Sequence, residues 1–224
     1  MIEILPAIMP DSYVDLEAKA AKVKGLVPFV QIDIMDGAFV LSRSWPYRED
    51  GTIETISLPF RDTLRYEVDL MVATPAEAAR MWIEAGAARV LFHIESTEDP
   101  LCLIEDLSAE YGASATKGIL EIGVAIDIAT PNDRLEPILH EVGTVQFMGI
   151  AKIGYQGEPF DERVLGKIRE LRGKHPETII SVDGGVNFET ASRLLHAGAK
   201  RLVAGSAIYT AENIAEAIKK LQNM

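Results

Sequence analysis

The sequence has little of several features that define whole classes of proteins. It holds one cysteine, Cys102, in 224 residues, so no disulfide can form within the chain. No apolar run approaches the roughly 20 residues needed to cross a lipid bilayer, and Met1 leads straight into a strand-like segment without the pattern of a signal peptide. These absences argue against a disulfide scaffold and a membrane-spanning chain, and we expect a cytoplasmic protein.

Positive charge is also scarce. The chain carries 22 Lys and Arg against 34 Asp and Glu, a formal net charge of -12. Because like charges repel, this balance disfavours nonspecific binding to nucleic acid or to an anionic membrane, and we expect neither as a partner. An anionic ligand must therefore be held by local hydrogen-bond donors. The 48% of hydrophobic residues suffices for a large core.

Short apolar, β-branched runs alternate with longer segments of helical periodicity, which is the pattern of repeated βα units and a parallel sheet. Eight such pairs predict a (β/α)₈ TIM barrel that forms a single domain over residues 1–224. An open doubly wound sheet would show the same alternation, but no G-x-G-x-x-G follows the first strand. The predicted strands are residues 3–8, 29–34, 65–70, 89–93, 119–126, 144–150, 178–182 and 201–204.

Two of the helical segments have clear end signals. Residues 11–23 begin with Asp11, an acidic N-cap candidate. Residues 76–85 follow Pro75, which suits a first helical turn, and precede Gly86, which suits a helix end. Both sets of signals agree with the periodicity.

Polar side chains stand at the ends of four predicted strands, where TIM barrels carry their active sites. Gln31 and Asp33 are two residues apart and therefore face the same side of their strand. Asp69, His93 and Asp183 end three other strands. One such aspartate commonly caps the next helix, but three that converge on the barrel axis favour a site, because they raise one another's pKa unless a cation or substrate group intervenes. His93 we interpret as a core histidine.

Glycine-rich turns follow the last three predicted strands. They read G-Y-Q-G at 154–157, D-G-G-V-N at 183–187 and G-S-A at 205–207. Isolated glycines usually just permit a tight turn. Here the three loops are neighbours in a barrel, and the loops after strands 7 and 8 form the usual TIM-barrel phosphate site. The predicted phosphate-binding residues are Gly154, Gly157, Gly184, Gly185, Gly205 and Ser206.

These stretches together resemble the ribulose-phosphate 3-epimerase family over nearly the whole chain. The resemblance starts at L-P-A-I (5–8) and is densest in S-V-D-G-G-V-N (181–187) and L-V-A-G-S-A-I-Y (202–209). It implies a ribulose-phosphate-binding (β/α)₈ barrel in which a divalent metal sits between two histidines and two aspartates. It also implies that the two aspartates, Asp33 and Asp183 here, exchange protons with carbon 3 of a phosphorylated ketopentose.

The chain departs from the family pattern at the implied metal site. The two metal histidines are replaced by Gln31 and Asp69, and the opening serine is Ala7. The remaining set of Gln31, Asp33, Asp69 and Asp183 offers oxygen atoms alone, which suits magnesium or manganese rather than zinc. The sequence therefore predicts an altered metal site holding Mg²⁺ or Mn²⁺, or no metal at all.

A second departure is Lys152, which stands where the family has a strand-end asparagine. We expect the predicted strand 144–150 to direct Lys152 into the barrel mouth, where it balances a carboxylate or forms a Schiff base with a ketone. The leading prediction is an epimerase or isomerase acting on a phosphorylated ketose. A Schiff-base aldolase using Lys152 and a catalytically silent sugar-phosphate-binding protein remain open, and we expect a homo-oligomer.

Overall fold

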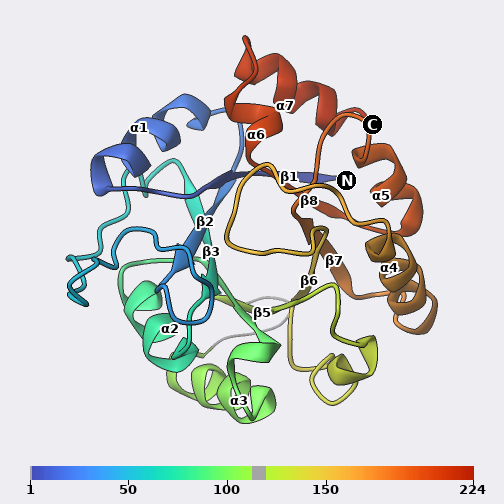
Figure 1. Cartoon of the computed structure of the whole chain (residues 1–224), viewed down its shortest axis with the longest axis horizontal. Coiled ribbons are helices and arrows are strands. Elements are labelled where there is room, and N and C mark those ends of the chain that lie inside the picture. The colour runs from blue at the N-terminus through green and yellow to red at the C-terminus, as the bar shows by residue number, and fades with distance from the viewer. Residues whose placement is uncertain (1, 113–119) are drawn as a thin grey trace.

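The computed structural model describes residues 2–112 and 120–224 as a closed barrel of eight parallel strands, paired in chain order from β1 to β8 and back to β1 (Figure 1). The predicted TIM barrel is confirmed. Residue 119 of the predicted fifth strand lies outside the described residues. The strands are β1 (Glu3–Ile8), β2 (Phe29–Met35), β3 (Arg65–Met71), β4 (Arg89–His93), β5 (Glu121–Ile126), β6 (Thr144–Met148), β7 (Ile179–Asp183) and β8 (Arg201–Ala204).

The α-helices of the described residues surround the barrel (Figure 1). The helix predicted from residue 11 begins at Tyr13, because the hydroxyl of Ser12, rather than Asp11, accepts from the Asp15 amide and caps it. The helix predicted at 76–85 starts at Pro75 and ends at Glu84. The helices are α1 (Tyr13–Val23), α2 (Pro75–Glu84), α3 (Pro100–Tyr111), α4 (Arg163–Lys174), α5 (Ala191–Ala197), α6 (Ser206–Tyr209) and α7 (Ile214–Gln222).

The expectation of a helix after every strand is wrong at two places. Residues 36–64, between β2 and β3, hold no helix, and β5 is followed by a short 3₁₀ helix, η2 (Asn132–Leu135). Between β2 and β3 the buried indole of Trp45 packs edge-on against Trp82 of α2 and also contacts the Tyr13 ring of α1. This irregular segment therefore fills the place of a helix with aromatic side chains.

The strands place apolar side chains between the barrel and the helices, and many polar ones inside the barrel. Outward-facing residues such as Ile32, Val68 and Phe92 are fully buried in the main hydrophobic core. On alternate positions the interior holds polar residues in layers, among them Gln31, Gln146 and Ser181. The period-2 geometry of a strand thus puts these polar residues inside the barrel, where they share the interior with a small apolar cluster of Leu5, Phe29 and Val203.

An ion network closes the end of the barrel that the N-terminal ends of the strands form. Arg201 contacts Glu3 at 2.6 Å and Glu121 at 2.9 Å, while Arg89 contacts the same two carboxylates at 2.9 and 3.1 Å. Glu67 is fully buried beside both guanidinium groups, and burial raises its pKa to about 7 although both arginines oppose the rise. This network supports the barrel and lies at the opposite end from the predicted site.

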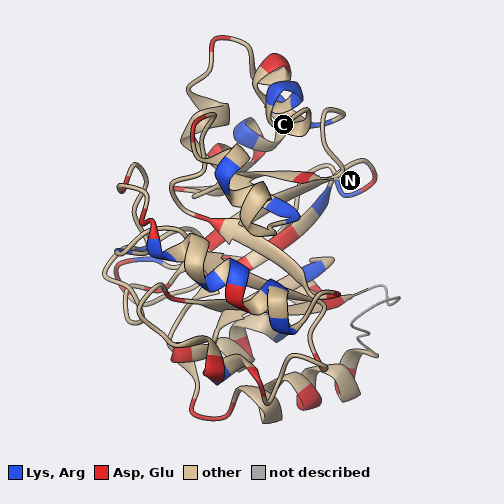
Figure 2. Cartoon of the chain, turned by 90° about the vertical axis from the view of Figure 1, so that its right-hand side faces the viewer, with Lys and Arg blue, Asp and Glu red and all other residues tan. Residues whose placement is uncertain are grey.

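Two of the outer helices differ in charge. Figure 2 shows acidic positions along α3, at the bottom of the view, and Lys and Arg positions along α4 in the middle. The segment between β6 and α4 instead folds across the mouth of the barrel (Figure 1). No helix in the described part of the chain has both the length and the apolar character needed to cross a bilayer.

Candidate active site

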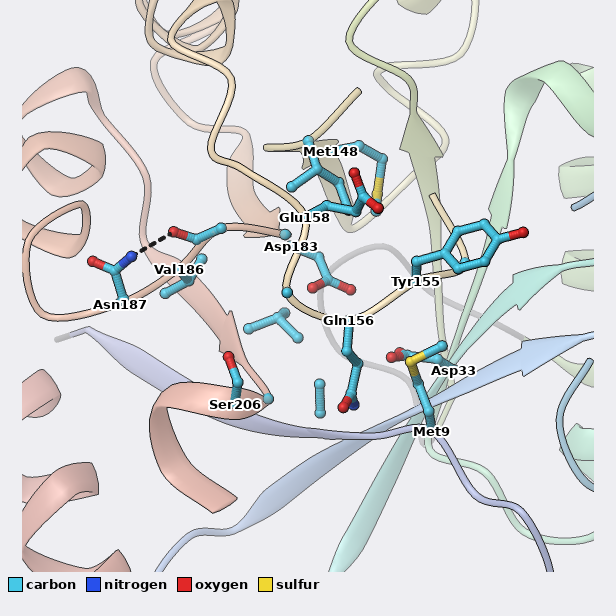
Figure 3. Close-up of a pocket in the computed structure, with 18 of the residues that line it drawn as sticks. Met9, Asp33, Met148, Tyr155, Gln156, Glu158, Asp183, Val186, Asn187 and Ser206 are labelled. Carbon is cyan, nitrogen blue, oxygen red and sulfur yellow. Dashed lines mark hydrogen bonds between the residues drawn. The ribbon is translucent and has the colours of Figure 1, made fainter. Parts of the chain in front are cut away.

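Two aspartates face each other across the mouth of the barrel. Asp33 in β2 and Asp183 at the end of β7 are linked by one amide, because Gln31 Nε2 donates to Asp33 Oδ1 at 2.8 Å and to Asp183 Oδ2 at 2.7 Å. Gln31 is fully buried and Asp33 is 6% exposed. Figure 3 shows both carboxylates directed into the same cavity. The closure of the barrel therefore brings together the sequence-predicted pair from distant parts of the chain.

The environment of this pair favours protonated carboxyl groups. Burial, and then the negative charges of Asp183 and Asp69, raise the pKa of Asp33 well above its usual range. Burial, and then the charge of Asp69, raise the pKa of Asp183 to about 7, although the Gln31 amide opposes the rise. Since the two groups interact, they titrate as a pair. Near neutral pH the pair can hold one proton, with one carboxyl as an acid and the other as a base.

Asp69 is the third aspartate of the cluster and is fully buried in β3. Its Oδ2 accepts a hydrogen bond from Gln146 Nε2 at 3.0 Å, and Gln146 Oε1 in turn accepts from the Ser181 hydroxyl at 3.0 Å. Its Oδ1 lies 3.5 Å from Nε2 of His93 and accepts no hydrogen bond within the described residues. The interior layer below the mouth thus fixes the orientation of Asp69.

A cavity of about 260 Å³ opens above the aspartate pair. Asp33 and Asp183 form its floor, and Tyr155 and Gln156 come from the β6–α4 segment (Figure 3). All six residues predicted to bind phosphate line it, namely Gly154, Gly157, Gly184, Gly185, Gly205 and Ser206. The three glycine turns therefore meet at one cavity, as their order in the chain predicts.

Gly185 shows why this turn needs glycine. Its φ of +69° lies in the left-handed region, and a Cβ there would come 2.9 Å from the main-chain Cα of Phe160. Asn187, two residues further along the turn, donates from Nδ2 to the Gly185 carbonyl oxygen at 3.3 Å (Figure 3). The side-chain-free backbone leaves peptide groups at the cavity wall.

The expected position of Lys152 is wrong. β6 ends at Met148, two residues before the predicted end, so that the strand does not direct Lys152 into the mouth. Its side chain is exposed, its Nζ lies 3.9 Å from the centre of the Tyr155 ring, and it does not line the cavity. An exposed amine that is stacked on an aromatic ring outside the cavity gives no support to a Schiff-base aldolase.

We therefore expect Lys152→Met to leave the catalytic rate of the protein within about twofold of the wild type, because surface substitutions away from a site change little. Borohydride reduction in the presence of dihydroxyacetone phosphate should add no mass to the wild-type chain. The measurement is intact-protein mass spectrometry with a parallel rate assay. A substrate-dependent adduct at Lys152 that is absent in Lys152→Met would restore the aldolase.

The predicted metal ligands form a cluster, with one exception. Asp33, Asp69 and Asp183 each offer a carboxylate oxygen, and these three atoms lie within 4.8 Å of one another. Their oxygens fit a hard divalent cation. Gln31 is oriented differently from the prediction, because its Nε2 donates to two of these carboxylates while its buried Oε1 has no hydrogen-bond partner among the described residues. In this arrangement the Gln31 amide holds two of the three carboxylates by hydrogen bonds.

Sequence reasoning missed several side chains of this end of the barrel. Gln146 and Ser181 are polar residues at inward-facing strand positions, and Ser181 stands two residues before Asp183. Glu95 and Asp127 lie beside His93, at the ends of β4 and β5. The period-2 pattern could have identified the first two. Glu95 and Asp127 follow the ends of their strands, where the alternation of strand residues no longer predicts which way a side chain points.

The sequence matches the profile of the family described as "Ribulose-phosphate 3 epimerase family" over residues 3–209. The match includes Asp33, Asp183 and all three glycine turns. The chain belongs to the ribulose-phosphate 3-epimerase family. It is 31% identical to a ribulose-phosphate 3-epimerase of Mycobacterium tuberculosis, covering 98% of this chain and 91% of that protein. It is 30% identical to one of Synechocystis, covering 99% and 94%.

Solved structures support the fold at lower identity. A 3-hexulose-6-phosphate synthase superposes with a TM-score of 0.67 at 19% identity, covering 100% of this chain and 99% of the other. KGPDC from Streptococcus mutans gives a TM-score of 0.65 at 17% identity, covering 100% and 97%. At these identities the likeness concerns the TIM barrel alone.

Proposed function

We propose that the protein is an epimerase that exchanges the proton at carbon 3 of a phosphorylated ketopentose, with D-ribulose 5-phosphate as the substrate to test. The observation that carries this proposal is the pair of buried carboxylates, Asp33 and Asp183, at the floor of a cavity walled by three glycine turns. The family membership and the names of its relatives agree with this chemistry. The retained aspartate pair argues against a silent binding protein.

The phosphate group of the substrate binds at the glycine side of the cavity. Backbone N–H groups of tight turns suit a phosphate, and at Gly184 and Gly185 there is no side chain to keep it away. Ser206 can add its hydroxyl from the start of α6. The chain's net charge of -12 makes such local donors necessary. With the phosphate at this wall, the carbon chain extends towards the two aspartates.

The aspartate pair then carries out inversion. An ionised carboxylate removes the proton from carbon 3 on one face of the substrate, and the protonated partner delivers its proton to the opposite face. After one turnover the two groups have exchanged roles, and the same pair serves the reverse reaction. The raised pKa values place this one-proton state near neutral pH. Gln31 holds both carboxylates in place by donating to each of them.

A hard divalent cation fits the carboxylate cluster, and we propose Mg²⁺ or Mn²⁺ held by Asp33, Asp69 and Asp183. Such an ion would supply positive charge to the oxygens that become negative when carbon 3 loses its proton. The prediction is that chelator-treated protein loses at least about tenfold in rate and recovers with Mg²⁺ or Mn²⁺. Steady-state rates before and after metal addition test it. A rate unchanged by chelation would show that the reaction does not require a metal ion.

The phosphate wall makes a separate prediction. Gly185→Ala should raise the KM for the phosphorylated ketose by about tenfold or more, because the new Cβ both strains a left-handed backbone and pushes the turn from Phe160. The fold-change in kcat should be smaller than the fold-change in KM. Gly173→Ala is the matched control, since a Cβ there meets nothing within 4 Å. Equal KM values in the wild type and Gly185→Ala would show that the phosphate binds somewhere other than this turn.

The direct test of the proposed function is conversion of D-ribulose 5-phosphate to its carbon-3 epimer by purified protein. NMR of the reaction mixture separates the two ketoses. Conversion in both directions supports the epimerase. Binding of the substrate without conversion, under metal-replete conditions, would favour the silent binding protein.

A further inference from the structure

His93, Glu95 and Asp127 form a second cluster beside the aspartate pair. His93 ends β4, Glu95 lies in the short 3₁₀ helix η1 (Ile94–Ser96) that follows it, and Asp127 follows β5. One ligand atom from each lies within 4.8 Å of the others. None of the three was predicted as a ligand from the sequence. The proposed epimerase function does not use this cluster.

The atoms of this cluster are turned towards one another without being bonded. His93 is completely buried, and its Nδ1 lies 3.5 Å from Asp127 Oδ1 and 3.7 Å from Glu95 Oε2. All three atoms are buried and have no hydrogen-bond partner within residues 2–112 and 120–224. Leaving a buried polar atom unpaired costs about 1–3 kcal/mol, and more for a charged group. Three such atoms turned to one point are a candidate set of ligands for a cation.

We propose that Nδ1 of His93 and the free oxygens of Glu95 and Asp127 bind a divalent cation of the zinc class. Zinc takes nitrogen at about 2.0–2.1 Å and carboxylate oxygen at about 2.0–2.2 Å. An ion at such distances from atoms 3.5 and 3.7 Å apart would see angles of about 110–135°, which are tetrahedral or somewhat wider. The distances are too long for good hydrogen bonds and suit two ligands of one ion.

The surroundings already hold the three ligands in place. The second oxygen of Glu95 accepts from the Asp127 main-chain amide at 3.0 Å, which fixes the two acidic residues relative to each other. The Phe39 ring packs at 5.4 Å from the His93 ring and covers it. The other ring nitrogen, Nε2, faces Asp69 Oδ1 at 3.5 Å. Metal-bound histidines commonly donate their second N–H to a carboxylate in this way.

No lysine or arginine of the described residues lies within 4.0 Å of the two free oxygens. Lys167 on α4 reaches this end of the barrel, but its Nζ donates to the main-chain oxygens of Asp127 and Thr130. Among the described residues it makes no ion pair within 4.0 Å with either carboxylate. The carboxylates are 22% and 32% exposed, so that an ion can enter from solvent. Three protein ligands also leave a fourth position for water.

Cobalt is the probe for this site, because a four-coordinate Co²⁺ bound by nitrogen and oxygen absorbs visible light strongly and an octahedral all-oxygen site absorbs weakly. Chelator-stripped full-length protein is titrated with Co²⁺ and then with Zn²⁺, with absorbance and calorimetry as readouts. We expect an intense band that saturates at one equivalent and disappears when Zn²⁺ replaces Co²⁺. Binding should release a proton if His93 is protonated beforehand.

Variants separate this site from the aspartate pair. Asp127→Asn should lose the band and weaken Zn²⁺ binding by at least tenfold, while Asp183→Asn should keep the band. Asp133→Asn, at a side chain 83% exposed, is the matched control and should keep it too. Thermal unfolding shows that each variant folds, and Zn²⁺ should raise the Tm of the wild type but not of Asp127→Asn.

Two results overturn the proposal. The first is a wild type with no intense band and no zinc-dependent rise in Tm, which would show that a proton on His93 satisfies the cluster. The second is an intense band that survives in Asp127→Asn and disappears in Asp183→Asn, which would place the ion at the aspartate pair. Neither result depends on whether the protein epimerises D-ribulose 5-phosphate, so failure here is distinguishable from failure of the proposed function.

Discussion

Replacing either aspartate of the pair by asparagine is expected to reduce the conversion of D-ribulose 5-phosphate by at least about 10²-fold, because general acid–base groups contribute roughly 10²–10⁴-fold. Asparagine keeps the shape of the side chain, and its oxygen can still accept from Gln31 Nε2. The variants Asp33→Asn and Asp183→Asn therefore remove proton transfer and leave the cavity. The measurement is the initial rate of formation of the carbon-3 epimer at saturating substrate.

The control for this pair is Asp62→Asn, an exposed position outside the cavity, which should keep the wild-type rate. Each carboxylate serves one face of the substrate. One variant can therefore still exchange the carbon-3 hydrogen of one epimer with solvent while conversion is lost. Such a result would identify the aspartate that faces this hydrogen. Conversion at the wild-type rate in both variants would assign the chemistry to other residues.

Arg201→Met is expected to lower the free energy of unfolding by about 3–5 kcal/mol, the cost of leaving buried charges unpaired. Arg201 is 5% exposed at its side chain and contacts Glu3 and Glu121, with Glu67 at 3.7 Å. Methionine fills much of the space but supplies no donor. Urea unfolding monitored by circular dichroism gives the difference. Arg193→Met, which breaks an exposed ion pair with Glu162, should cost less than about 1 kcal/mol.

The loss in Arg201→Met should depend on pH in a definite direction. Burial raises the folded-state pKa of Glu67 to about 7, from an unfolded value of 4.5. A carboxyl whose pKa is raised by folding is protonated in the folded protein at low pH, and the folded state loses stability as pH rises through the raised value. Removing Arg201 takes away a charge that opposes this rise. The variant should therefore be more destabilised at pH 8 than at pH 5, and an equal loss at both values would contradict this assignment.

The barrel could be predicted from the sequence because each strand is a short apolar run that can be recognised locally. The apolar, β-branched runs of β1, β4 and β8 match the predicted bounds in the structure. The segment 36–64 was missed because Pro46, Gly51 and Pro59 prevent a helix, while the packing of Trp45 on Trp82 replaces one. That packing joins residues far apart in sequence, and no local sequence pattern predicts it.

The site, like the fold, could be predicted from the sequence only where a local pattern marks its residues. Asp33 and Asp183 could be named because strand ends converge in a barrel and because the resemblance gave them a role. The position of Lys152 was wrong because the strand ends two residues earlier than its apolar run suggests, and one changed bound redirects every side chain after it. Glu95 and Asp127 follow the ends of their strands. Their convergence on His93 requires the three-dimensional register of β4 and β5.

The central claim is that Asp33 and Asp183 exchange protons with carbon 3 of a phosphorylated ketopentose. Incubation of the metal-replete wild type with D-ribulose 5-phosphate in D₂O, followed by ¹H NMR and mass spectrometry, tests it most directly. We predict deuterium at carbon 3 in both epimers, gained at a rate at least as fast as their interconversion. Substrate that stays fully protonated at carbon 3 while demonstrably bound in the cavity would contradict it.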